Sequence, residues 1–183
     1  MNFNKTFLCA VCIAAFASGC GEPKPEDVSG ATAVGAVGPI YASSKGYSIE
    51  HPADWTYDRN ADGFFSSEEG ENDVLRESFN VDVESLEASP EMTLEQFAAS
   101  KADTLKTKLN AEVLGVTDAS LGGLPAKEIS YISRQGGMVF KITNYIAIKD
   151  KKAYMLACIS LEETYPKYKE TFERIVSTFQ FKK

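Results

Sequence analysis

Four strand-like segments between residues 111 and 161, joined by very short turns, constrain the fold of this chain more than any other feature. The segments are rich in β-branched and aromatic residues, and they cover residues 111–121, 125–133, 138–149 and 152–161. The turns between them contain Gly122-Gly123, Gly136-Gly137 and Asp150-Lys151. Because connections this short can join only neighbouring antiparallel strands, the region is predicted to be a β-meander.

Two other segments have the spacing of amphipathic helices. In residues 92–109, Thr93 and Gln96 form the pattern of an N-terminal capping box, with Met92 and Phe97 at the staple positions. Residues 164–181 carry a second apolar stripe, made of Tyr165, Tyr168, Phe172, Ile175, Val176 and Phe179. Since Phe97 combines the staple position with the apolar stripe of the first helix, we expect it to be buried against the sheet.

The fold class follows from the order of these elements. Shorter strand-like segments precede the first helix, at residues 47–51, 55–58, 63–67 and 79–86. Both helices need a sheet against which to bury their apolar stripes. The predicted fold is therefore α+β, with a single antiparallel meander sheet flanked by two helices, in one domain spanning residues 46–183.

The first twenty residues are typical of a bacterial lipoprotein signal. Lys5 precedes an apolar run, residues 7–17, that is too short to span a bilayer, and the run ends in the sequence ASGC. This ending resembles a lipobox, which implies that residues 1–19 are removed and that Cys20 carries the lipid. Cys9 and Cys12 would leave with the signal. The alternative interpretations are a plain secretory signal and an uncleaved anchor.

Residues 20–45 are rich in Gly, Pro, Ala and Ser and are predicted to be a flexible tether behind the lipidated Cys20. The chain carries a net charge of -7, and loss of Lys5 with the signal would leave -8. An acidic chain disfavours nucleic acid and anionic lipid surfaces as partners. The expected location is the bacterial cell envelope, with membrane contact through the lipid on Cys20, and the outer membrane facing the periplasm if the source has two membranes.

Four phrases of the sequence resemble the Mog1/PsbP-like α/β/α sandwich family, which includes PsbP-domain proteins and DcrB-like bacterial lipoproteins. These phrases lie at residues 46–55, 89–101, 121–131 and 165–179. The resemblance implies the sandwich fold and a non-enzymatic role, because most family members bind or assemble other proteins. Plant PsbP associates with photosystem II and Mog1 binds a small GTPase, but no residue here can be matched to either binding surface.

Residues 58–69 match the pattern of a calcium-binding EF-hand loop. Asp58, Asn60, Asp62 and Glu69 occupy liganding positions, Ser66 takes position 9 and Gly63 takes position 6. An EF-hand also needs a helix on each side, whereas the sequence before Asp58 contains Pro52 and is strand-like. The competing interpretation is a polar hairpin turn between two strands, and we expect no metal site.

The remaining chemistry-bearing residues do not form a recognisable catalytic pattern. The single histidine, His51, excludes a His-based triad, and the sequence contains no P-loop, G-x-S-x-G or G-x-G-x-x-G motif. Cys158 lies in an apolar run and is expected to be buried and inert. The carboxylate pairs Glu68-Glu69 and Glu162-Glu163 are expected to be solvated. We therefore expect no cofactor and no catalytic residue.

These observations favour a membrane-anchored envelope lipoprotein that acts as a non-enzymatic binding or assembly module for an envelope protein or complex. The alternative is a lipoprotein that binds or senses calcium or a small ligand through the loop at residues 58–69. An enzyme would have to work with carboxylates and with tyrosine or lysine alone.

Overall fold

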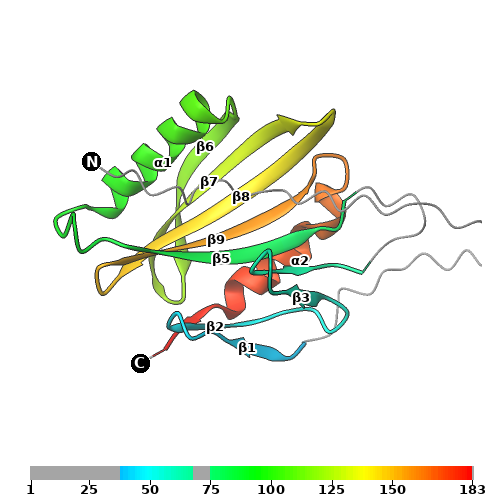
Figure 1. The fold of residues 1–183 in the computed structure, drawn as a ribbon, viewed down its shortest axis with the longest axis horizontal. Coiled ribbons are helices and arrows are strands. Elements are labelled where there is room, and N and C mark those ends of the chain that lie inside the picture. The colour runs from blue at the N-terminus through cyan, green and yellow to red at the C-terminus, as the bar shows by residue number, and fades with distance from the viewer. Residues whose placement is uncertain (1–37, 68–74, 183) are drawn as a thin grey trace, which may run out of the picture.

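The computed structural model describes residues 38–67 and 75–182, which form two helices and two antiparallel sheets (Figure 1). The larger sheet has seven strands in the order β3-β4-β5-β9-β8-β7-β6, and the smaller has the order β1-β2-β10. The elements are β1 Ile40–Ala42, β2 Tyr47–Glu50, β3 Thr56–Asp58, β4 Gly63–Phe65, β5 Ser78–Ser85, α1 Leu94–Lys108, β6 Glu112–Leu121, β7 Leu124–Gln135, β8 Met138–Lys149, β9 Lys152–Leu161, α2 Tyr165–Thr178 and β10 Gln180–Phe181.

The predicted meander is confirmed as strands β6 to β9, which pair in sequence order. At the turn between β8 and β9, Asp150 and Lys151 have φ values of 50° and 57°. At the turn between β6 and β7, Gly122 and Gly123 have φ values of 57° and 79°. Two successive left-handed residues match the twist of the flanking strands, so these turns fix the register of the meander.

The two faces of the large sheet carry two separate hydrophobic cores. Along β9, Tyr154, Leu156 and Cys158 point to one face, whereas Ala153 and Met155 point to the other. Helix α1 contacts β6, β7 and β8 and covers the core on one face, which we call the α1-side core. Helix α2 contacts β9 and β2 and covers the core on the other face, which we call the α2-side core (Figure 1). The sheet is therefore a central layer with a helix on each side, which confirms the predicted α+β sandwich.

The start of α1 agrees with its sequence pattern. The Thr93 hydroxyl accepts a hydrogen bond from the Gln96 backbone N–H at 3.2 Å, and the Gln96 side-chain oxygen accepts one from the Thr93 N–H at 3.0 Å. Phe97 follows one residue later and is 3 % exposed within the α1-side core. The predictions of the capping box and of a buried Phe97 are both confirmed.

The small sheet differs from the expected architecture. Strand β2 pairs with β1 on one side and with β10, the last strand of the described residues, on the other. Strand β1 falls inside residues 20–45, which were expected to be a tether, because three residues are too few to show a period. The folded unit therefore starts at least six residues before Gly46, and residues 1–37 lie outside the described part of the chain.

The N-terminus of α2 is anchored by a buried carboxylate from another element. Glu77, which precedes β5, is 3 % exposed, and its Oε1 accepts a hydrogen bond from the Thr164 hydroxyl at 2.6 Å. Thr164 is the N-cap residue of α2, and its side chain makes no bond to the helix itself. The first turn of α2 contains no acidic residue, and the hydrogen bond from Thr164 to Glu77 joins the start of the helix to the residue before β5.

We expect Thr164→Val to lower the free energy of unfolding by about 1–3 kcal/mol, because it removes a hydroxyl that donates to a buried carboxylate. Thr164→Ser keeps the hydroxyl and should stay close to the wild type. Urea unfolding of the two variants measures the difference. Equal stability of the two would show that the hydrogen bond to Glu77 does not anchor α2.

Candidate functional site

The acidic stretch at residues 58–67 forms a hairpin between β3 and β4. This agrees with the competing interpretation of the EF-hand pattern, a polar hairpin turn between two strands. Asp58 ends β3, and its carboxylate accepts hydrogen bonds from the backbone N–H groups of Asn60 and Ala61 at 2.7 and 3.3 Å. The left-handed residue of the turn is Asp62, with φ of 49°. The side chain of Asp58 therefore closes the turn of the hairpin.

Asp62 connects this hairpin to the turn between β1 and β2. One carboxylate oxygen accepts a hydrogen bond from the Lys45 ammonium group, and the other accepts one from the Tyr57 hydroxyl. Burial acts to raise the Asp62 pKa, but the bonds from Lys45 and Tyr57 outweigh it, and the net shift is downward. The hydrogen bond between Tyr57 and Asp62 raises the Tyr57 pKa, because the phenol proton is shared with a carboxylate.

Aromatic rings make a second connection between the two sheets at the same place. Tyr41 on β1 stacks on Tyr57 of β3 at a centroid distance of 5.2 Å, and both rings contact Phe64 of β4 at 5.2 and 5.1 Å. Phe64 is buried, whereas Tyr57 is 39 % exposed and the neighbouring Ile40 is 66 % exposed. We refer to Ile40, Tyr41, Lys45, Tyr57 and Asp62 together as the Tyr57 corner.

We expect Asp62→Asn to lower the free energy of unfolding at neutral pH by at most about 1 kcal/mol, because the ion pair with Lys45 is largely exposed. The folded-state pKa of Asp62 lies below its unfolded value. Its contribution is therefore present at neutral pH and is lost as the pH falls through the folded-state pKa.

Urea unfolding at several pH values should therefore show a smaller acid loss of stability for Asp62→Asn than for the wild type. Lys45→Met removes the ion-pair partner of Asp62 and should reduce the acid loss of stability in the same way. An unchanged acid profile in both variants would contradict the role given to this pair.

The positions of the calcium pattern are distributed among different structural roles. Ser66 is buried, with its hydroxyl 3.4 Å from Glu77, and the carboxylate of Asp62 is bound by Lys45 and Tyr57. Gly63 lies in β4, where a Cβ would be 3.1 Å from the Phe79 carbonyl oxygen, so the glycine permits close approach of β5. Glu68 and Glu69 lie outside the described residues. Within residues 38–67 and 75–182, no group of three His, Cys, Asp or Glu side chains could bind a metal ion.

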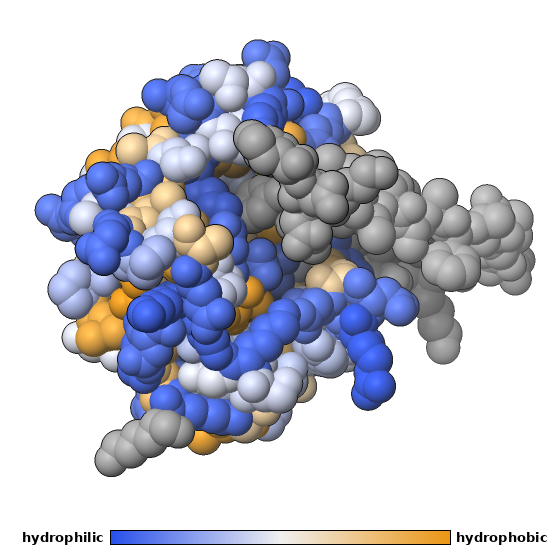
Figure 2. All heavy atoms as spheres, turned by 60° about the vertical axis from the view of Figure 1, so that its left-hand side comes forward, coloured by the Kyte–Doolittle hydropathy of each residue, from blue (hydrophilic) through white to orange (hydrophobic). Residues whose placement is uncertain are grey.

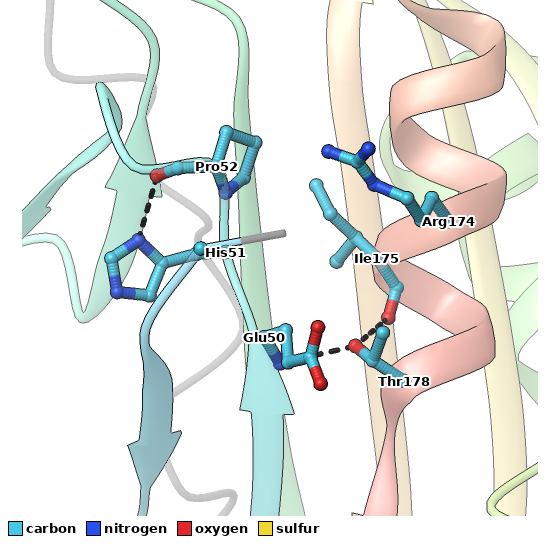
Figure 3. Close-up of a pocket in the computed structure, with 7 residues that line it drawn as sticks. Glu50, His51, Pro52, Arg174, Ile175 and Thr178 are labelled. Carbon is cyan, nitrogen blue, oxygen red and sulfur yellow. Dashed lines mark hydrogen bonds between the residues drawn. The ribbon is translucent and has the colours of Figure 1, made fainter. Parts of the chain in front are cut away.

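A shallow hollow between the end of β2 and α2 is lined in part by the only histidine, His51, whose ring points away from α2 (Figure 3). The His51 Nδ1 donates a hydrogen bond to the Pro52 carbonyl at 2.9 Å, and the ring stacks on Phe64 at 4.4 Å. The hollow opens to solvent and has room for no more than about one water molecule. Ligand pockets usually have about 300–1,000 Å³. His51 directly follows the last residue of β2, and its ring is engaged in local packing.

The other candidate residues named from the sequence are either buried, solvated or outside the description. Cys158 is 1 % exposed, and burial raises the pKa of its thiol, so the thiolate is disfavoured. Glu162 and Glu163 are exposed between β9 and α2. Cys20 lies outside the described residues. Of the helices in the described part of the chain, neither has the length and hydrophobicity needed to cross a membrane.

Sequence reasoning missed most of the Tyr57 corner. Lys45 is seventeen residues from Asp62 in the chain, and no local pattern links the two. Ile40 and Tyr41 were assigned to the tether, although an Ile-Tyr pair in a segment otherwise rich in small residues is a signal that could have marked them. The face seen in Figure 2 is mostly hydrophilic, with hydrophobic side chains in small separate areas.

Comparisons with known proteins identify the fold. The PsbP family model matches residues 40–181, whereas no curated protein matches the chain. The solution structure of cyanobacterial PsbP (CyanoP) from Synechocystis sp. PCC 6803 is 17 % identical, with a TM-score of 0.59 over 84 % of this chain and 98 % of that one. LpqN of Mycobacterium tuberculosis, described as involved in cell envelope biogenesis, is 13 % identical, with a TM-score of 0.53 over 75 % of this chain and 83 % of that one.

A third solved structure has the same fold. PA94 of Pseudomonas aeruginosa, described as a protein of unknown function and putative regulator, is 10 % identical. Its TM-score is 0.52 over 75 % of this chain and 92 % of that one. At these identities the likeness extends to the fold alone.

Proposed function

Because the chain belongs to the PsbP family, we propose that it is a non-enzymatic binding or assembly module held on the bacterial cell envelope by a lipid on Cys20. The family match supports a binding role, and the similar fold of LpqN supports a place in the envelope. The sequence ASGC after an apolar run supports the lipid. The partner in this proposal is an envelope protein or complex.

The observation that carries the proposal is the Tyr57 corner. Tyrosine supplies large, amphipathic contact area and is enriched at the centres of protein interfaces. Here the Tyr57 ring is fixed from two sides, by stacking on Tyr41 and by the bond from its hydroxyl to Asp62. A side chain fixed before binding loses little conformational entropy on contact with a partner. The corner is thus an exposed and preorganised contact surface.

The corner also lies next to the place where the tether would enter the domain. Ile40 and Tyr41 belong to β1, the first strand in the described part of the chain. If residues 20–37 behave as the flexible tether that their composition predicts, they would have a root-mean-square length of roughly 25 Å. A lipid on Cys20 would therefore keep the corner within a few nanometres of the membrane, where an envelope partner can reach it.

Membrane fractionation and intact mass test the anchor. We expect the wild-type chain to lack residues 1–19, to carry acyl chains and to partition with the membrane, and Cys20→Ala to lose the acyl mass and the membrane partition. Cys12→Ala changes a cysteine of the same region and should behave as the wild type. An unchanged mass and partition for Cys20→Ala would refute the lipid anchor.

Site-specific photo-crosslinking in intact cells tests the binding surface. A photoreactive phenylalanine in place of Tyr57 should give a discrete adduct with another envelope protein, whereas the same residue in place of the exposed Lys169 on α2 should not. Tyr41→Ser should weaken that adduct about tenfold, since it removes the ring on which residue 57 stacks. Equal labelling from positions 57 and 169 would contradict a specific surface at the corner.

A further inference from the structure

Strand β6 is an outer strand of the large sheet, at the edge opposite the Tyr57 corner. Its ten residues pair with β7 on one side only, and the other outer strand, β3, has three residues. A long edge strand presents a row of backbone N–H and C=O groups that can pair with another strand. The β6 edge is therefore the longest open strand edge in the described part of the large sheet.

The exposed apolar side chains of the described residues gather at two places. Ile40 and Tyr57 lie at the Tyr57 corner, and the other three lie along the β6 edge. Leu109 at the end of α1 is 36 % exposed, Leu114 is 50 % exposed and Val116 is 45 % exposed. A β-bulge between Val113 and Gly115 leaves Leu114 without an opposite residue on β7. We refer to Leu109, Leu114 and Val116 as the β6-edge patch.

The two ends of this edge carry opposite charges. At one end, Glu95 of α1 and Asp118 of β6 flank Lys127 of β7, which leaves a net negative charge. At the other end, Lys106 and Lys108 are exposed in the last turn of α1, and Glu112 of β6 is paired with Arg134 of β7, which leaves a net positive charge. Glu95 and Lys106 are eleven residues apart, close to three helical turns, so they lie on the same side of α1. The Glu95–Lys127 contact places that side next to β6 and β7.

We propose that β6 pairs antiparallel with β6 of a second copy of this chain, which joins the two large sheets into one. A two-fold axis near Val116 would bring the β6-edge patches of both copies together. It would also place Glu95 of each copy near Lys106 of the other and Asp118 opposite Leu114, so that no carboxylates face each other across the axis. The proposal goes beyond the binding function, because it concerns the opposite edge of the sheet.

The charge pattern is the reason to choose a second copy as the occupant. An edge that is acidic at one end and basic at the other is complementary to itself only when the second strand runs antiparallel. The symmetric interface uses the same patch twice and closes on itself, so it gives a dimer and not a fibre. Pairing with a strand from a different protein would not require the β6 edge to be complementary to itself.

Disulfide trapping of the full chain in envelope membranes tests the dimer. Residue 116 lies near the proposed axis, where facing Cα atoms of paired strands are about 4.5–5.5 Å apart, a separation suited to a disulfide. Val116→Cys should therefore form a covalent homodimer under mild oxidation. Ile40→Cys is a matched control, because Ile40 is even more exposed but lies at the opposite edge. It should form about tenfold less dimer.

Charge reversal in the Val116→Cys chain tests the register. Glu95→Lys or Lys106→Glu alone should lower the trapped fraction about five- to tenfold, since each creates two like-charge contacts across the axis. The two reversals together should restore the trapped fraction. Thermal unfolding of each variant checks that α1 remains folded.

Three outcomes would overturn the proposal. These are equal trapping by Val116→Cys and Ile40→Cys, trapping of position 116 to a different protein, and no recovery in the double reversal while the domain stays folded. Since membrane partition and photo-crosslinking at residue 57 are measured separately, failure of the dimer is distinguishable from failure of the binding function.

Discussion

Phe97→Ala is expected to lower the free energy of unfolding by about 3–5 kcal/mol. Phe97 is 3 % exposed and packs between α1 and the sheet in the α1-side core. The loss combines the transfer of a large ring from the core with the cavity that it leaves. Chemical unfolding followed by far-ultraviolet circular dichroism measures the effect.

Phe97→Leu is the matched control for this change. It keeps an apolar side chain of intermediate size, so it should be clearly less destabilising than alanine. A near-wild-type stability of Phe97→Ala would show that α1 contributes little to the folded state, in conflict with the packing of Phe97.

Phe79→Ala should have an effect of the same size in the other core. Phe79 is 1 % exposed, stacks on Phe64 at 4.9 Å and lies 5.9 Å from the Trp55 ring. Its removal should cost about 3–5 kcal/mol through the same loss of packing. Trp55 is the single tryptophan of the chain, so its fluorescence reports on the α2-side core alone.

The two variants together test whether the two cores unfold as one unit. If they do, fluorescence of Trp55 and circular dichroism give the same unfolding midpoint in Phe97→Ala, although Phe97 and Trp55 lie on opposite faces of the sheet. If the α1-side core unfolds first, the two midpoints separate. A fluorescence signal of Phe79→Ala with the wild-type midpoint would contradict the assignment of Phe79 to the α2-side core.

The long elements were predictable because each has a strong local cause. Strands β8 and β9 have the predicted bounds, since the turn at Asp150 and Lys151 fixes where one ends and the next begins. The α1 helix followed from its capping box. Strand β10 was not predicted, because two residues have no period and its formation depends on pairing with β2.

The candidate site was less predictable, because it depends on contacts between distant parts of the chain. The hairpin at Asp58 was predicted from local polarity and from the strand-like sequence before it. The bond from Lys45 to Asp62 and the stacking of Tyr41 on Tyr57 arise only when the small sheet docks on the large one. The hydrogen bond that anchors the N-terminus of α2 is also between distant residues, because Glu77 and Thr164 are 87 residues apart in the sequence.

The pairing of β2 with β10 has a consequence for the biosynthesis of this protein. Ser48 pairs with Gln180, so β2 cannot complete this pairing until 132 more residues have been synthesised. At 5–20 residues per second, that interval is roughly ten seconds. Phe179 also belongs to the α2-side core and packs on Tyr47 at 5.4 Å. A nascent chain can therefore build the meander during translation, but it cannot close the α2-side core until residues 179–181 have left the ribosome.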